Sequence, residues 1–375
     1  MITFDRVIKR YGNNEVLHSI SLSLPQGEII SIIGRSGCGK TTLLKTINRL
    51  IPLTSGKILI NGQDIQSMNP VTLRRQIGYV IQQTGLFPHM TIYENLATVL
   101  QLHHVSKIEY EPQIQKIVDK VGLSRNLLPR YPAELSGGQQ QRVGVARALI
   151  TNPEIILMDE PFSALDPITR LSLQDEILHL QTMLHKTIVF VTHDMDEAIK
   201  ISDHICLMRD GHVEAFATPE MILRQPSTPY VANFIGKHRI WNSPEFIKAE
   251  DIMISATNLC YPQDTLLRCM NKIQNIAQDY LIVVASDTKV FCGLINVRLI
   301  RKQKNLNLTA ADIMQQPVAT AGMKDSLPQI LMTVKKLRRP YMVVLDDQRC
   351  FQGLITQSSL VAALGRQYVD ETEAI

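Results

Sequence analysis

The sequence predicts an α/β fold with buried parallel strands in its central sheet, followed by a smaller α+β domain that is internally duplicated. A glycine-rich loop lies between an apolar run at 28–33 and a helical pattern at 42–47. Two later apolar runs, 155–160 and 187–194, end in polar residues, as buried parallel strands do at the ligand-binding edge of a sheet. Finally, a stretch of about 60 residues near the C-terminus occurs twice.

The glycine-rich loop fits the phosphate-binding pattern G-x-x-x-x-G-K-[ST]. Its glycines let successive backbone N–H groups point at one anion, and a helix that begins here adds partial positive charge. Lys40 is placed to reach the β and γ phosphates of a nucleotide, and the Thr41 hydroxyl is placed to bind Mg²⁺. The alternative is a glycine turn without a ligand. The loop consists of Gly34, Arg35, Ser36, Gly37, Cys38, Gly39, Lys40 and Thr41.

Composition narrows the class of protein. A chain of 375 residues with 45% apolar residues has room for two or three domains. The net charge of +4 is too small to indicate nucleic-acid binding. The six cysteines form no C-x-x-C pair, so we expect no structural zinc and a reducing cytosol. No apolar run is long enough to cross a bilayer, so a membrane role would need a partner.

The residues around the loop predict a β-rich neighbourhood. Residues 2–24 alternate between apolar and polar types and predict an antiparallel sheet of short strands, interrupted at Tyr11. By itself Tyr11 is more typical of an edge aromatic than of a platform for a base. Residues 57–65 predict a hairpin whose turn is Asn61-Gly62.

Two further segments precede the next motif. Residues 76–96 predict a strand that ends at Gln82, followed by an exposed apolar loop at 86–88, a kind of loop that often binds a partner. Residues 107–128 predict a polar-faced helix that starts near Glu111-Pro112.

Residues 135–149 read LSGGQQQRVGVARAL and predict an amphipathic helix capped by Ser136. Gly137 and Gly138 leave backbone N–H groups open, so the segment is either a second anion site or an ordinary cap, and local features favour neither.

Acidic residues end the strand predicted at 155–160. Next to a phosphate loop, we expect Asp159 to serve a metal ion and Glu160 to orient water. His193 follows the neighbouring strand. Because the carboxyl ends of parallel strands share one edge, Lys40, Asp159, Glu160 and His193 should converge.

Together these motifs resemble the ATP-binding subunits of ABC transporters, over residues 1–240. Residues 34–41 resemble the Walker A loop, 135–139 (LSGGQ) the ABC signature, and 156–160 Walker B. Residues 163–166 look like the D-loop. His193 occupies the place of the switch histidine, Gln82 that of the Q-loop, and Tyr11 that of the adenine-stacking residue.

The resemblance implies an ABC cassette, with a mixed central sheet and with helical and antiparallel β subdomains, that hydrolyses ATP as a homodimer. Two copies would pair head to tail, so that Ser136 and Gly138 contact the γ-phosphate bound by the other copy. Glu160, His193 and Lys40 would be catalytic, and Thr41, Gln82 and Asp159 would hold Mg²⁺. The implied ATP-binding residues are Tyr11, Gly34, Arg35, Ser36, Gly37, Cys38, Gly39, Lys40, Thr41, Thr42, Gln82, Ser136, Gly137, Gly138, Gln139 and Asp166.

The duplicated region resembles a tandem CBS pair. Asp251-Ile-Met recurs as Asp312-Ile-Met, and Gly293-Leu-Ile recurs as Gly353-Leu-Ile. Each repeat predicts a helix, two strands and a helix. We expect a linker at 241–250, repeats at 251–308 and 309–367, and an acidic, disordered tail at 368–375.

The resemblance leaves the ligand of these repeats open. The family's nucleotide pattern ends in an aspartate that holds a ribose, but 353–359 has Ser359 there, and the first repeat lacks the aspartate as well. This disfavours AMP or ATP and leaves a cyclic dinucleotide, which has no free ribose diol, or sensing of ionic strength. Two basic patches are either solvated faces or contacts to anionic lipid; they are Arg298, Arg301, Lys302 and Lys304, and Lys335, Lys336, Arg338 and Arg339.

An ABC ATPase followed by paired CBS domains resembles the importers of osmoprotectants such as glycine betaine, carnitine and choline. This implies an ATPase subunit at the cytoplasmic face of the membrane, bound to permease subunits and served by an extracytoplasmic substrate-binding protein. The alternatives are an importer of another solute, such as an amino acid or polyamine, a non-transport ABC ATPase, and a module that only senses a ligand.

Overall fold

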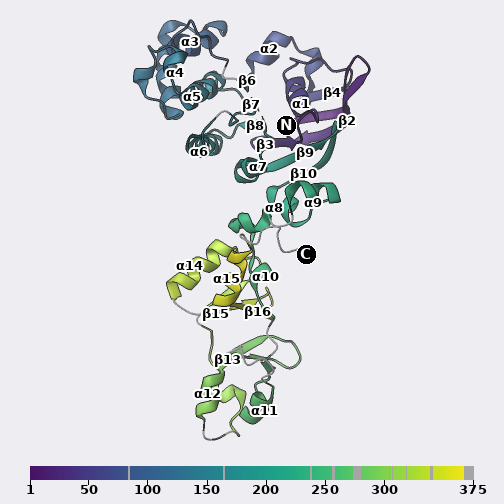
Figure 1. Cartoon of the computed structure of the whole chain (residues 1–375), viewed down its shortest axis with the longest axis vertical. Coiled ribbons are helices and arrows are strands. Elements are labelled where there is room, and N and C mark those ends of the chain that lie inside the picture. Colours follow the sequence, from purple (N-terminus) through teal and green to yellow (C-terminus); the bar gives the residue numbers. More distant parts are fainter. Residues whose placement is uncertain are drawn as a thin grey trace, which may run out of the picture. The chain divides into compact units, whose positions relative to one another are not determined.

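The computed structural model describes residues 1–82, 85–163, 165–236, 239–255, 258–272, 280–303, 305, 307–317, 319–337 and 341–366. It divides into two compact units, Met1–Ile235 and Gly236–Ile375, each described here by itself (Figure 1). The boundary at 240, the linker and the two repeat ranges remain predictions. Of the residues singled out in the sequence, Ala164, Lys304, Arg338, Arg339 and the tail at 368–375 lie outside the described residues.

A six-stranded sheet forms the centre of the first unit, with the strand order β10-β9-β3-β8-β7-β6. The pairs β3–β8, β3–β9, β7–β8 and β6–β7 are parallel, and β9–β10 is antiparallel, which confirms the mixed central sheet. The strands are β3 (Ile29–Gly34), β6 (Ile77–Val80), β7 (Ile155–Asp159), β8 (Thr187–Val191), β9 (His204–Arg209) and β10 (His212–Ala217).

The sequence placed the end of one of these strands too late. β6 ends at Val80, two residues before Gln82, so Gln82 lies in the loop that follows the strand. The apolar run continues through Ile81, and this continuity extended the predicted strand beyond its last ladder pair, Val80 with Met158.

A four-stranded antiparallel sheet, in the order β2-β1-β4-β5, confirms the predicted β subdomain. Its strands are β1 (Ile2–Tyr11), β2 (Asn14–Leu24), β4 (Ser55–Ile60) and β5 (Gln63–Asp64). The first two have 10 and 11 residues, so the expectation of short strands was wrong. Asn61 and Gly62 both have positive φ, as a two-residue type I′ hairpin turn requires.

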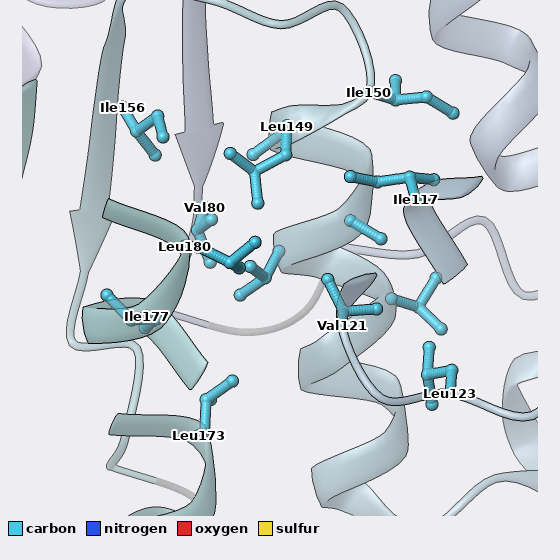
Figure 2. Close-up of a cluster of buried hydrophobic side chains, with 14 of the residues drawn as sticks. Val80, Ile117, Val121, Leu123, Leu149, Ile150, Ile156, Leu173, Ile177 and Leu180 are labelled. Atoms are coloured by element: carbon cyan, nitrogen blue, oxygen red, sulfur yellow. The ribbon is translucent and has the colours of Figure 1, made fainter. Parts of the chain in front are cut away.

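The helices of the first unit include a separate helical group whose apolar faces share one core with the central sheet. Figure 2 shows part of that core, in which Val80 of β6, Leu149 and Ile177 come from different elements. The helices are α1 (Lys40–Ile47), α2 (Pro70–Arg75), α3 (Ile92–Leu102), α4 (Lys107–Lys120), α5 (Gly137–Leu149), α6 (Pro167–Leu184), α7 (Met195–Ile201), α8 (Pro219–Arg224) and α9 (Pro229–Ile235).

α4 corrects the predicted helix at 107–128. It begins at Lys107, because Ser106 and Glu109 form a capping box, and it ends at Lys120. Pro112 therefore lies inside the helix and does not start it. From there to residue 128 the chain forms a short 3₁₀ turn at Arg125–Leu127.

The second unit contains two three-stranded sheets of the same design, which confirms the duplication. They consist of β11 (Leu259–Cys260), β12 (Tyr280–Val284) and β13 (Phe291–Asn296), and of β14 (Thr320–Gly322), β15 (Tyr341–Leu345) and β16 (Phe351–Thr356). In each, the first strand is parallel to the second, and the second and third are antiparallel. The sequence predicted two strands per repeat and missed β11 and β14, because two or three residues are too short for a periodic signal.

The two sheets share a hydrophobic cluster that includes Ile282, Leu294 and Val343. A bridge between Val290 and Cys350 also joins them. The helices of this unit are α10 (Ala249–Ile252), α11 (Leu266–Asn271), α12 (Val297–Lys302), α13 (Ala310–Ile313), α14 (Leu327–Leu337) and α15 (Gln357–Gly365). Within the described ranges, no helix has the length and apolarity needed to span a membrane.

Candidate functional site

The phosphate loop leaves β3 at Gly34 and enters α1 at Lys40. Gly34, Gly37 and Gly39 all have positive φ, a conformation that other residues rarely adopt. At Gly34 a Cβ atom would lie 2.3 Å from the backbone oxygen of Met208, so no side chain fits there. Arg35, Ser36 and Gly37 are exposed, whereas Cys38, Gly39 and Lys40 are buried, so the loop presents its outer turn to solvent.

Lys40 carries a buried positive charge at this loop. Its side chain is 7% exposed, and its Nζ donates to the backbone oxygens of Gly34 (2.8 Å) and Arg35 (3.0 Å). Within the described ranges, no carboxylate lies at ion-pair distance from it. Because buried charges are almost always compensated, this ammonium is suited to an anionic ligand such as phosphate.

Thr41 and Asp159 meet at the start of α1, where the Thr41 hydroxyl donates to Asp159 Oδ1 at 2.8 Å. The other carboxylate oxygen, Oδ2, lies 3.3 Å from Nζ of Lys45. A hydroxyl and a carboxylate are hard oxygen donors of the kind that Mg²⁺ prefers, so the pair fits that ion. Lys45 was missed in the sequence, although it lies four residues after Thr41 and hence on the same helix face.

Glu160 follows β7 directly and connects two of the predicted site residues. Nε2 of Gln82 donates to Glu160 Oε2 at 2.8 Å, and His193 Nδ1 lies 3.7 Å from Glu160 Oε1. A cavity of about 40 Å³ opens beside them, lined by polar side chains that include Ser163 and Thr192. It is polar and large enough to hold a water molecule. Of the four residues expected to converge, Glu160 and His193 approach each other directly, and Asp159 is bonded to Thr41, the residue that follows Lys40.

A buried network supports the loop that carries His193. Thr192 donates to Glu197 Oε2 at 2.5 Å, and Nε of Arg170 lies 3.6 Å from Glu197 Oε1. Burial is the largest influence on the Glu197 carboxyl and raises its pKa. The network joins α6 to α7. No sequence pattern identifies Arg170 or Glu197, because their pairing depends on how two helices pack.

The signature segment forms its own cap at the start of α5. Ser136 Oγ accepts from the backbone N–H of Gln139, and the Gln139 side chain accepts from the backbone N–H of Ser136. Gly138 packs so closely on Thr169 that a Cβ atom would lie 2.3 Å from its Cγ2. Within the described part of the chain, the hydrogen bonds of Ser136 and Gln139 stay in this turn and do not reach the phosphate loop.

The remaining predicted residues flank the site. Asp166 caps α6 by accepting from the N–H groups of Ile168 and Thr169, and hydrogen bonding by Thr169 lowers its pKa. Thr42 lies in the first turn of α1. Tyr11 ends β1 with 48% of its surface exposed. Its hairpin borders the phosphate loop, since a Cβ atom at Gly39 would lie 3.0 Å from Leu17 of β2.

Comparison with known proteins agrees with this geometry. The model of the ABC transporter family matches residues 17–163, and the CBS domain model matches residues 310–366. The choline transport ATP-binding protein OpuBA of Bacillus subtilis is 42% identical, with 96% of this chain and 95% of that protein covered. The carnitine transport ATP-binding protein OpuCA of Listeria monocytogenes is 43% identical, with 96% and 91% covered.

A solved structure extends the comparison. A dimeric ATP-binding cassette in a post-hydrolysis state, bound to ADP and Pi, is 34% identical. It covers 58% of this chain and 99% of its own, with a TM-score of 0.54. The shared motifs, the cassette fold and the full-length similarity to transport subunits agree. The chain therefore belongs to the family of ABC transporter ATP-binding subunits, and its C-terminal region contains a CBS domain.

Proposed function

We propose that this chain is the ATP-hydrolysing subunit of an importer for quaternary-amine osmoprotectants. The observation that carries the proposal is the buried ammonium of Lys40, which has backbone carbonyls but no carboxylate as partners in the described ranges. Such a charge in a glycine-rich loop needs the phosphates of a nucleotide. The curated relatives transport choline, carnitine and glycine betaine by their names, which supports the choice of solute.

Each site residue would have its own role in phosphoryl transfer. Lys40 and the loop N–H groups would hold the phosphates and offset charge that grows in the transition state. Glu160 would orient the attacking water, while Gln82 and His193 hold its carboxylate and approach the γ-phosphate. Thr41, Asp159 and Gln82 would hold Mg²⁺, which, when bound, neutralises phosphate charge. Tyr11 would stack on the adenine.

The second half of each site would come from another copy of the chain. The glycines of the signature segment leave N–H groups open at the start of α5, and they lie in a turn that makes no hydrogen bond to its own phosphate loop within the described residues. A head-to-tail homodimer would place Ser136, Gly137, Gly138 and Gln139 against the γ-phosphate bound by its partner. Asp166, at the start of α6, would lie at the same interface.

Replacing Glu160 with glutamine tests the catalytic assignment. The Glu160→Gln variant keeps the shape of the side chain and loses its charge, so we expect ATP turnover to fall by at least about 100-fold while ATP binding persists. Light scattering should then show an ATP-dependent dimer of about twice the monomer mass. Full activity in this variant would overturn the role of Glu160, and a monomer with bound ATP would overturn the shared site.

Identifying the solute and the membrane partners requires the assembled transporter. We infer that the chain works at the cytoplasmic face of the membrane, bound to permease subunits that receive solute from an extracytoplasmic binding protein. Vesicles that contain all components should couple ATP hydrolysis to uptake of glycine betaine, carnitine or choline. Uptake of only amino acids or polyamines would identify the solute class as wrong, and turnover independent of any permease would favour a non-transport ATPase.

The CBS region would regulate this uptake. In the second repeat, Ser359 replaces the ribose-binding aspartate and donates to the Thr356 carbonyl at 3.0 Å, so it is occupied in the cap of α15. The described members of the basic patches, Arg298, Arg301, Lys302, Lys335 and Lys336, are exposed. Adding a cyclic dinucleotide, varying the salt or varying the fraction of anionic lipid in the same vesicles distinguishes the three signals. Uptake that responds to none of them would argue against regulation.

A further inference from the structure

We propose that Lys9 is a positioning residue for the nucleotide base, because it fixes the ring of Tyr11 from one face and leaves the other face for adenine. The inference rests on the proposed ATPase function and on the stacking role of Tyr11, and it adds a residue that no sequence motif singled out. Lys9 and Tyr11 are two residues apart on β1, so their side chains emerge on the same face of the strand.

The first step is the contact itself. Nζ of Lys9 lies 4.6 Å from the centroid of the Tyr11 ring, within the range of a cation–π interaction. Tyr11 as a whole remains 48% exposed, although one face of its ring is covered by this ammonium. A half-exposed ring with one covered face is a platform whose open side can accept a flat, apolar surface such as a purine.

The second step is the burial of the lysine. Lys9 is only 8% exposed, and its Nζ donates to the carbonyl oxygen of Pro52 at 2.9 Å. Among the described residues, no carboxylate pairs with it, so its charge is met by one carbonyl and one aromatic ring. Cation–π attraction is strongest where the cation is removed from water, and this makes the ring a substantial partner of the charge.

The third step is the rigidity of the support. The segment around Pro52 is held to β1 by two further hydrogen bonds: the N–H of Thr54 donates to the Ile8 carbonyl, and the N–H of Arg10 donates to the Thr54 hydroxyl, each at 2.9 Å. Lys9 therefore connects a fixed loop to a fixed strand. A ring oriented in advance loses less conformational freedom when the base binds, and this raises affinity without a new contact to the nucleotide.

The charge also acts on the ring electronically. Aromatic faces are electron-rich, so two stacked rings repel through their π systems. A cation under one face draws electron density toward itself and weakens this repulsion on the open face. Lys9 should therefore strengthen stacking of the base and leave the phosphate contacts of Lys40 unchanged.

The test compares ligands with and without a base in the full chain. Calorimetric titration measures the Kd of ADP and of pyrophosphate, both with Mg²⁺, for wild type and Lys9→Met, which keeps the apolar stem of the side chain. We expect Lys9→Met to raise the Kd of ADP about three- to tenfold and to leave that of pyrophosphate unchanged. In ATPase assays KM should rise and kcat should stay constant. Lys57→Met on β4 is the matched control, because Lys57 is exposed on the same sheet.

Two further variants complete the test. Lys9→Arg keeps a cation under the ring and should restore most of the affinity for ADP. In a Tyr11→Ala background, Lys9→Met should have no further effect on ADP, because the pair acts through the ring. An equal rise in Kd for pyrophosphate, or an undiminished effect without Tyr11, would overturn the assignment. If Tyr11→Ala leaves the Kd of ADP unchanged, base stacking and the Lys9 role both fail, whereas the ATPase function, tested at Glu160, stands.

Discussion

At the scale of single residues, the candidate site contains two kinds of side chains. Some have residue types that phosphate and metal binding require, and the contacts of others are apparent only in the folded structure. Lys40, Thr41, Asp159 and Glu160 were predictable, because phosphate and metal chemistry needs those residue types next to a turn or at the end of a buried strand. Lys45 and Lys9 were not, since a lysine carries no pattern of its own. Their roles depend on a partner that lies across the fold or two residues along a strand.

The pH dependence of folding stability tests the environment of the Glu197 carboxyl. Burial raises the pKa of its carboxyl above the value in the unfolded chain, so the folded state binds the proton more tightly. The carboxyl therefore lowers stability as the pH rises from its unfolded pKa to its folded pKa, and the full cost applies above that window. Glu197→Gln, which cannot ionise, should lack this loss.

Urea unfolding of wild type and Glu197→Gln between pH 4 and 7 measures the difference. We expect the stability of the wild type relative to the variant to fall as the pH rises. A difference that is independent of pH would show that Arg170 and the Thr192 hydroxyl compensate the charge completely.

At the scale of elements, a helix or strand was predictable where its pattern was long and its ends were marked. The capped helix α5 and the buried strands β7 and β8 followed from the sequence. The errors occurred where local signals conflict with hydrogen bonding over distance. Pro112 suggested a helix start that the capping box at Ser106 overrides, and the short strands of the second unit depend on ladder partners far along the chain.

The helix α6 provides a matched pair of substitutions on one element. Ile177 is 2% exposed in the core shared with β7 and α5, whereas Leu171 is 53% exposed on the same helix (Figure 2). Ile177→Ala should lower the free energy of unfolding by about 2–5 kcal/mol, because it leaves a cavity. Leu171→Ala should change it by less than about 0.5 kcal/mol. Denaturant titration followed by circular dichroism measures both, and equal effects would contradict the assigned faces.

At the scale of the whole molecule, the chain combines a nucleotide-binding unit with a duplicated unit that has cores of its own. In the described part of the chain, five hydrophobic clusters each lie within one unit, two of them in the first unit and three in the second. Trp241, the single tryptophan of the chain, packs on the core of the second unit, and the Arg366 guanidinium lies 4.5 Å from its ring centroid. Its fluorescence therefore reports on the core of the second unit.

This placement predicts two separable melting transitions. ADP with Mg²⁺ at about 100 times its Kd should stabilise the first unit by about 2.7 kcal/mol, because the proposed nucleotide site lies in that unit. Circular dichroism should show this shift, and tryptophan fluorescence should show a transition that does not move. A fluorescence midpoint that rises together with the dichroism would mean that the two units unfold as one.

Glu160 has a positive φ of 47°, which residues other than glycine seldom adopt, and its N–H donates to the Val191 carbonyl at 3.0 Å. The neighbouring strand thus dictates the direction of this side chain against its own conformational preference. Any other side chain at position 160 should therefore point in the same direction. A cysteine there, labelled with a spin probe, would place a reporter at the point where water is expected to attack, without redesign of the surrounding backbone.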